Sequence, residues 1–273
     1  STTTVSMGSG DDDLLIPNIA TNAPLTADTG AGNDHVLVGS HAHWTRSAGA
    51  FQSPSNNAGS LNSIASLITV DMGTGNADQL WLDETGESAA NSPGYLTATT
   101  MRGLGMVPHS GAEDATGGIA YSHVEDLDLR LGTSSDTIFA RSTHADTHTS
   151  IHTGAGSSTT VNVGSQLSAL NANLNDIAGI LSVLGESSDD ILNLYDNADT
   201  IGNQGVLTSS TVTGLGIGQR IDYAGLETLT LELGSGADTL HVDSTHTTDT
   251  YLFGHNGDDE FQLEQIDGFT RIE

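Results

Sequence analysis

The sequence predicts an all-β fold, a parallel β-solenoid (β-helix or β-roll-like) in which successive coils of the chain stack and loops are inserted between strands. Three observations support this prediction. A short glycine–aspartate motif recurs along the chain, longer segments repeat above it, and apolar residues alternate with polar ones in runs of four to seven residues. Such internal repeats are typical of solenoids, whose units stack and contact only their neighbours.

The recurring motif reads glycine, a small residue, glycine or serine, one or two small or polar residues, aspartate, and then alternating apolar positions. It occurs with its aspartate at 7–16, 29–38, 72–82, 131–140, 184–194, 233–242 and 254–263, and without it at 153–163. Neighbouring copies are 21 or 22 residues apart, as Asp12 is from Asp34 and Asp259 from Asp238. This spacing fits one coil of a solenoid, whose glycine-rich corners then align in a column.

Longer segments repeat as well. The segment 95–106 is similar to 206–217, 119–132 to 221–234, and 61–70 to 174–183. We therefore expect one continuous solenoid that contains repeat unit 1 (residues 1–128), repeat unit 2 (129–230) and a partial repeat unit 3 (231–273). Both termini interrupt this periodicity, which predicts either a fragment of a longer array or subunits that stack head to tail.

Pairs of apolar residues two positions apart predict the strands, because alternate side chains of a strand lie on one face. These pairs are Leu14/Ile16, Val36/Val38, Leu80/Leu82, Ile138/Ala140, Leu192/Leu194, Leu240/Val242 and Phe261/Leu263. The segments 61–70 and 167–181 fit short helices and strands equally well. The segments 41–60, 86–93 and 107–117 are rich in small and polar residues and are predicted to be loops.

Composition excludes several classes of function. The chain has 273 residues, with 35 Asp and Glu against 6 basic residues, all of them arginine, and a formal net charge of −29. Nucleic-acid binding through phosphates needs clustered basic residues, so we expect none. No apolar run approaches the ~18 to 20 residues of a membrane helix, so we expect no membrane insertion. Cysteine is absent, which excludes disulfides and thiolate metal sites. The arginines are scattered and no nucleophile motif is present, so we expect no enzyme.

The repeated aspartates favour a metal ion. In a solenoid, equivalent side chains lie about 5 Å apart, and two carboxylates at that distance repel by roughly 1 to 3 kcal/mol. Calcium suits such a column because it takes six to eight oxygen ligands in flexible geometry and accepts backbone carbonyls beside carboxylates. The same corners also suit turn formation alone, since Gly, Asn and Asp are the residues that turns require.

The motifs resemble degenerate copies of the calcium-binding nonapeptide of RTX (hemolysin-type) proteins, Gly-Gly-x-Gly-x-Asp-x-apolar-x. The long unit is similar to the tandem arrays of very large bacterial surface and extracellular proteins. In the RTX family, glycine carbonyls and aspartate carboxylates bind Ca²⁺ between successive turns. Carried over position by position, the resemblance implies these metal ligands: Gly8, Gly10, Asp12, Gly30, Gly32, Asp34, Gly73, Gly75, Asp78, Asp136, Asp190, Gly234, Gly236, Asp238 and Asp259. Unlike the family's motifs, those of this chain are isolated, one per coil, and Met, Leu or Thr often replaces the first glycine.

We therefore expect a non-catalytic, Ca²⁺-stabilised structural module outside the cell or on its surface, in a fibre, sheath, surface layer or adhesin. Its expected partners are neighbouring copies or further repeats of the same chain, stacked head to tail. One alternative is a carbohydrate-binding, adhesive solenoid that contacts extracellular glycans through loops 41–60 and 107–117, with Trp44 and Trp81 as stacking platforms. Another is a β-helix enzyme that degrades polysaccharides. The spacing of His144, His148 and His152 permits a zinc site, although a polar surface explains it more simply.

Overall fold

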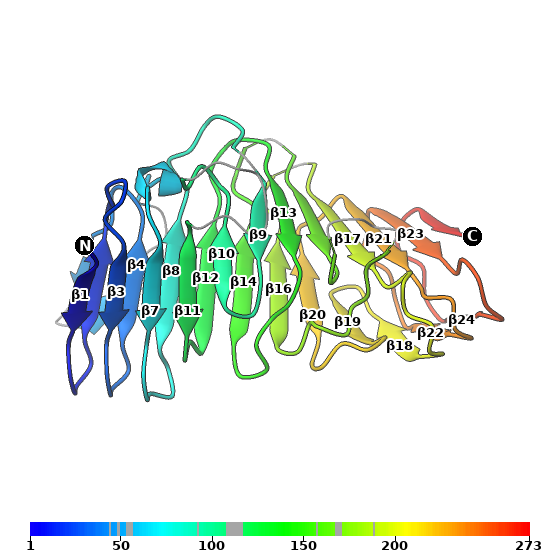
Figure 1. The fold of residues 1–273 in the computed structure, drawn as a ribbon. Coiled ribbons are helices and arrows are strands. Elements are labelled where there is room, and N and C mark those ends of the chain that lie inside the picture. The colour runs from blue at the N-terminus through cyan, green and yellow to red at the C-terminus, as the bar shows by residue number, and fades with distance from the viewer. Residues whose placement is uncertain are drawn as a thin grey trace.

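The protein forms one elongated stack of coils, with the two termini at opposite ends (Figure 1). The computed structural model describes residues 1–43, 45–47, 50–52, 57–91, 93–107, 117–156, 158–166, 171–187 and 189–273. Two long sheets line the stack, and a coil is one passage of the chain through both of them. The expectation of an all-β, parallel solenoid is confirmed.

The first sheet has 12 strands. In spatial order they are β1 (Thr3–Ser6), β3 (Leu25–Asp28), β7 (Ile68–Asp71), β11 (Ile119–Ser122), β10 (Thr100–Arg102), β9 (Gly94–Leu96), β13 (Thr137–Ala140), β15 (Thr160–Val163), β17 (Ile191–Tyr195), β21 (Thr228–Glu232), β23 (Asp249–Phe253) and β25 (Thr270–Ile272).

The second sheet has 11 strands. Their order is β2 (Asp13–Ile16), β4 (His35–Val38), β8 (Gln79–Asp83), β12 (Asp126–Arg130), β14 (His148–His152), β16 (Ile180–Leu184), β20 (Ile221–Ala224), β19 (Thr211–Gly214), β18 (Gln204–Leu207), β22 (Thr239–Val242) and β24 (Glu260–Leu263).

The hydrophobic core lies between the two sheets. The predicted apolar pairs of the inner coils point into it and are fully buried, as Val36 and Val38 in β4 and Leu192 and Leu194 in β17 illustrate. The pairs in the outermost coils are less covered, and Leu263 in β24 is 49% exposed. Alternation thus predicted the inward face of each strand, and stacking decided how completely that face is buried.

Two hairpins interrupt the parallel stacking, one in each sheet. The repeated segment 95–106 forms most of β9 and all of β10, which pair antiparallel with each other, and β10 pairs antiparallel with β11. The equivalent segment 206–217 contributes to β18 and β19, which pair in the same way, β19 with β20. The antiparallel pairing was not predicted, because alternation alone does not give the direction of the neighbouring strand.

The two hairpins share their anchoring contacts. The hydroxyl groups of Tyr121 in β11 and Tyr223 in β20 each donate a hydrogen bond of 2.5 Å to a carbonyl oxygen of the adjoining turn, that of Thr97 and Thr208 respectively. Burial raises the pKa of both tyrosines, which suits a packing role. Tyr121 lies in the 12-stranded sheet and Tyr223 in the 11-stranded sheet. Equivalent residues of these two segments therefore lie on opposite faces of the stack.

The structure assigns the segments for which helix and strand were both open. Residues Leu61–Ser63 form a short 3₁₀ helix, η1, and Ile68–Asp71 form β7. The second segment, 167–181, ends in β16, and its residues 167–170 lie outside the described part. The predicted loop 41–60 contains a separate two-stranded hairpin, β5 (Thr45–Ser47) and β6 (Ala50–Gln52). Among the described residues, no helix is long and apolar enough to cross a membrane.

Candidate metal sites

The predicted metal-binding aspartates lie directly before strands, and hydrogen bonds link them from coil to coil. We call Asp12, Asp34, Asp78 and Glu125 the first ladder; they precede β2, β4, β8 and β12. Oδ1 of Asp34 accepts the backbone N–H of Asp12 at 2.9 Å, and Oδ1 of Asp78 accepts that of Asp34 at 2.7 Å. Oε2 of Glu125 then accepts the N–H of Asp78 at 2.9 Å. Each carboxylate thus caps the N–H of the preceding coil.

Two further ladders repeat this geometry. In the second ladder (Thr159, Asp190 and Glu227), Asp190 accepts the N–H of Thr159 at 2.9 Å, and Glu227 accepts that of Asp190 at 2.6 Å. In the third ladder (Asn203, Asp238 and Asp259), the corresponding distances are 2.7 and 2.9 Å. The two pairs predicted to lie one coil apart, Asp12/Asp34 and Asp238/Asp259, are therefore directly bonded. A buried N–H without an acceptor is costly, so the ladders contribute stability by themselves.

The second carboxylate oxygens of the first ladder have a different environment. Oδ2 of Asp12, Asp34 and Asp78 is buried, and no hydrogen-bond donor contacts it within the described part of the chain. Asp34 and Asp78 are themselves 0% exposed. Burial raises the pKa of Asp78 to about 6; the N–H of Asp34 opposes this shift, and the charges of Glu125 and Asp34 add to it. The ladder therefore stacks acidic oxygens in a water-poor space, which is unfavourable unless a proton or a cation compensates them.

Gly30 and Gly73 pack against the backbone of the preceding coil, whereas within the described part of the chain no atom beyond the adjacent residues lies within 4 Å of where a Cβ on Gly8 or Gly10 would be. A Cβ on Gly30 would lie 1.8 Å from the carbonyl oxygen of Gly8, and one on Gly73 equally close to that of Gly30. Both glycines also have positive φ, +97° and +75°. The carbonyl oxygens of Gly8 and Gly30 accept inter-coil N–H bonds of 2.8 Å from Ala31 and Thr74. Close stacking is thus one reason for glycine here, whatever the corner binds.

The second row of glycines leaves room for carboxylates. Gly32 packs against the carbonyl oxygen of Gly10, and Gly75 against that of Gly32. A Cβ on Gly75 would also lie 2.4 Å from Oδ2 of Asp78. In the third ladder, Gly234 and Gly236 face backbone of the preceding segment instead, at Asp199 and Ile201.

The remaining predicted aspartates differ in what contacts them. Oδ2 of Asp136 accepts the hydroxyl of Ser134 at 2.8 Å, whereas its buried Oδ1 has no donor among the described residues. Burial raises the pKa of Asp136. Oδ2 of Asp238 is also buried without a donor among the described residues. Asp259 is half-buried and ends the third ladder.

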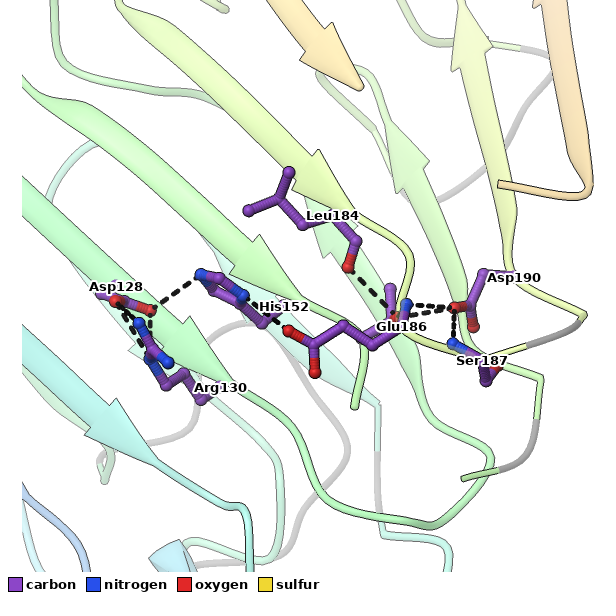
Figure 2. Close-up of polar contacts among 8 residues, drawn as sticks. Asp128, Arg130, His152, Leu184, Glu186, Ser187 and Asp190 are labelled. Carbon is purple, nitrogen blue, oxygen red and sulfur yellow. Dashed lines mark hydrogen bonds and ion pairs between the residues drawn. The ribbon is translucent and has the colours of Figure 1, made fainter. Parts of the chain in front are cut away.

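Asp190 is fully paired by contrast. Its Oδ2 accepts the backbone N–H groups of Glu186 and Ser187 at 3.0 and 3.1 Å, as Figure 2 shows, and the hydroxyl of Thr153 at 2.6 Å. Its Oδ1 accepts the N–H of Thr159. Both oxygens of this carboxylate are occupied by protein donors.

Acidic side chains that were not predicted lie near two of the predicted aspartates, Asp238 and Asp136. In the second unit they are Asp196 and Asp199, which neighbour Asp238. Their counterparts near Asp136 are Glu84 and Glu87. Burial raises the pKa of Asp196 to about 7 and that of Glu84 to about 8, and nearby carboxylates add to both shifts. They lie outside the motif, but the repeat alignment places Glu84 with Asp196 and Glu87 with Asp199, and that recurrence was the available signal.

The histidines contact several different acids. His152 lies between Asp128 (3.6 Å) and Glu186 (2.9 Å), and Arg130 holds Asp128 from the other side at 2.7 Å (Figure 2). His148 instead contacts Asp126, at 3.7 Å. These contacts link neighbouring strands at the surface, and within the described ranges His144, His148 and His152 do not form a shared ligand set.

One grouping of three potential ligands occurs within the described residues: His241, Asp243 and Glu264, whose ligand atoms lie within 4.8 Å of one another. Both of its carboxylates are exposed. Trp81 is 5% exposed and stacks on His35 with ring centroids 5.5 Å apart, so its ring is not a free sugar platform. Trp44, most of loop 107–117 and parts of loop 41–60 lie outside the described residues.

The chain matches no protein-family model, no curated protein and no solved structure. The resemblance to RTX repeats therefore stays a prediction that rests on the glycine–aspartate motifs, and calcium binding stays a prediction with it.

Proposed function

We propose that the chain is a non-catalytic structural module of an extracellular repeat array, in which calcium bound along the first and third carboxylate ladders stabilises the coils, and in which neighbouring copies or further repeats of the same chain stack end to end. One observation carries this proposal. Apolar positions that are fully buried inside the stack recur in the last coil, where they are exposed.

The register of the strands establishes this equivalence. Val183 pairs with Ile151, and Ile272 pairs with Leu252, the counterpart of Ile151. Val183 is 0% exposed and Ile272 is 36% exposed. Six residues earlier in each segment, Ile177 is 0% exposed and Ile266 is 43% exposed. Burying this apolar surface beneath another coil is favourable, at ~25 cal/mol per Å².

The earlier copies indicate what covers such a coil. The strand β20 covers β16 in parallel register, as β11 covers β7. At the two ends of the stack, β1 and β25 are the outer strands of one sheet and β2 and β24 those of the other. A second copy stacked head to tail would therefore continue both sheets. It would also place Asp12 of one copy after Asp259 of the other, which extends a carboxylate ladder across the junction.

The negative charge at the junction between stacked ends is the reason for proposing calcium. The junction brings Asp12 and the acidic residues beside it toward Asp259 and the acidic residues beside that one. The chain as a whole has a net charge of −29. Buried carboxylate oxygens without a donor in the described part of the chain continue this acidity into the first ladder. A divalent ion with all-oxygen coordination neutralises such pairs, and backbone carbonyls at the corners supply further ligands. Calcium outside cells is abundant enough for binding to support folding and assembly.

Sedimentation velocity and electron microscopy of the purified chain test the proposal. In millimolar calcium we expect rods that lengthen with protein concentration, and in EDTA we expect single particles, because unneutralised ends repel. Phe269→Asp should abolish association, since Phe269 is 59% exposed in the last coil. Ile201→Asp is the matched control, because Ile201 is 66% exposed but lies away from the last coil.

Single particles at every calcium concentration would contradict end-to-end stacking. Equal loss of association in Ile201→Asp and Phe269→Asp would contradict the assignment of the contact to the last coil.

A further inference from the structure

We propose that Asp196 of the second unit and Asp238 of the partial third unit together bind one divalent cation, of the calcium type, with Asp199 as a negative charge beside it. This site deepens the calcium binding proposed above and rests on it. It differs from the predicted corner sites because Asp196 belongs to no glycine–aspartate motif.

The two proposed ligands are buried, and each has one oxygen engaged. Asp196 is 0% exposed and Asp238 is 1% exposed. Oδ1 of Asp196 accepts the N–H of Leu174 at 3.0 Å, and Oδ1 of Asp238 accepts that of Asn203 at 2.7 Å. In both residues, Oδ2 is buried and contacts no donor in the described ranges. Such oxygens are costly to bury unless they acquire a partner.

Asp199, the neighbouring acidic residue, is held in place by hydrogen bonds, so its carboxylate stays beside the proposed ion. Oδ2 of Asp199 accepts amide N–H groups from Asn175 at 3.1 Å and Asn203 at 3.0 Å, and its Oδ1 accepts the N–H of Ile201 at 2.8 Å. No arginine or histidine forms an ion pair with Asp196, Asp199 or Asp238 among the described residues. Three buried carboxylates with no basic partner attract a cation strongly.

Backbone carbonyl oxygens also lie close to the glycine corner that precedes Asp238. The carbonyl oxygens of Asp199 and Asp196 lie 2.5 and 3.3 Å from the position that a Cβ on Gly234 would take. Gly234 therefore admits these carbonyls at the corner before Asp238, where that of Asp199 accepts the N–H of Ser235 at 2.7 Å and that of Asp196 accepts the N–H of Asp199 at 2.8 Å. Oxygen ligands without nitrogen or sulfur favour Ca²⁺ over transition metals, and Ca²⁺ tolerates more flexible geometry than Mg²⁺.

At the position equivalent to Asp196, the first unit has a carboxylate with no free oxygen. Glu84 stands where the second unit has Asp196, and it is one methylene longer. Its Oε1 accepts the side-chain N–H of Asn91 at 2.7 Å, and its Oε2 accepts the N–H of Leu61. Asn203, the counterpart of Asn91, donates to Asp199 instead. The shorter Asp196 therefore has an oxygen free for an ion, whereas both oxygens of Glu84 are occupied by donors.

Calorimetric calcium titration, which counts bound ions, tests this site. We expect Asp196→Asn to bind one ion fewer than the wild-type chain, and Glu84→Gln to bind as many as the wild type. Asn at 196 can still accept the Leu174 N–H, so we expect an unchanged fold, which circular dichroism checks. Asp238→Asn should lose the same ion, so the double variant should lose one ion rather than two.

The outcomes separate this site from the proposed function. Absence of calcium binding by the wild-type chain would overturn both. Calcium binding by the wild type with an unchanged ion count in Asp196→Asn would overturn only this site. Loss of two ions in the double variant would show separate sites and overturn the shared one.

Discussion

Asp78 and Asp190 occupy the same place in two units, and they differ in what contacts the second carboxylate oxygen. Each donates its backbone N–H to a glutamate of the following coil, Glu125 or Glu227. Oδ2 of Asp190 accepts three hydrogen bonds from protein donors, whereas Oδ2 of Asp78 has no donor within the described part. Burial raises the pKa of Asp78 to about 6, and the charges of Glu125 and Asp34 add to this shift.

The comparison separates two roles of one motif position. The first oxygen caps the adjacent coil in both units, so the ladder itself is a structural device that operates without metal. The second oxygen depends on local partners, which Thr153, Glu186 and Ser187 supply only around Asp190. We therefore keep Asp78 in the proposed calcium set and leave Asp190 out of it.

The largest expected effect is that of Asp190→Asn. If the side-chain NH₂ takes the place of Oδ2, the part-buried N–H groups of Glu186 and Ser187 face a donor, and the Thr153 hydroxyl keeps only its bond to the Leu184 carbonyl. If the amide is reversed, Thr159 loses its acceptor. We expect a loss of about 2 to 4 kcal/mol in the free energy of unfolding, measured by urea denaturation. The loss should be the same in calcium and in EDTA.

Asp78→Asn is the matched counterpart. Its Oδ1 can still accept the N–H of Asp34, and the neutral amide relieves repulsion from Glu125 and Asp34. In EDTA we expect this variant to equal or exceed the wild type in stability, and in calcium to fall below it. A loss as large as that of Asp190→Asn in EDTA would show that the two oxygens are equally well paired.

The second effect is a dependence of stability on pH in the absence of divalent ions. The folded-state pKa values of Asp78, Asp196 and Glu84 are raised to about 6, 7 and 8, above the ordinary values of 3.8 for Asp and 4.5 for Glu. The folded state then binds more protons than the unfolded state between these values. The free energy of unfolding should therefore fall from about pH 4 to pH 8, by ~2 kcal/mol or more.

Urea denaturation at several pH values in EDTA measures this fall. Calcium should flatten the part of the fall that Asp78 and Asp196 contribute, because it replaces their protons as the pH rises, and should leave the part that Glu84 contributes. Stability that rises steadily from pH 5 to pH 8 in EDTA would contradict the raised pKa values of these three carboxyl groups.

The smallest expected effect concerns the tyrosine hydrogen bond that the two hairpins share. Tyr121→Phe and Tyr223→Phe each remove one hydroxyl-to-carbonyl hydrogen bond, so each should cost about 1 kcal/mol in the free energy of unfolding. Because the contacts match, the two costs should agree within a few tenths of a kcal/mol, with or without calcium. A clearly larger cost for one tyrosine would show that the two hairpins are not equivalent in stability.

Local patterns in the sequence predicted much of the fold. Apolar pairs such as Val36 and Val38 predicted the inward faces, and the spacing of Asp12 and Asp34 predicted neighbouring coils. The repeats also paired Tyr121 with Tyr223. The antiparallel hairpins and the opposite faces of equivalent residues were not predictable, because strand direction and sheet membership depend on contacts with distant segments.

The candidate site was predicted in part. The motif identified Asp34 and Asp78 as aligned carboxylates at the corners of neighbouring coils. Asp196 and Glu84 stand outside the motif and were missed, because their burial beside other carboxylates depends on how the coils stack.

What the sequence determined by itself is the periodic framework: alternating strands, glycine corners and a carboxylate before many strands, since these features depend on neighbouring residues and on their repetition. What only the tertiary structure decided is the surroundings of each carboxylate oxygen. Asp78 and Asp190 carry the same motif, yet only Asp190 receives on Oδ2 the hydroxyl of Thr153 from the preceding coil, together with the N–H groups of Glu186 and Ser187 from its own turn. Because the cost of a buried charge depends on its nearest partners, that distinction exists only once the coils are stacked.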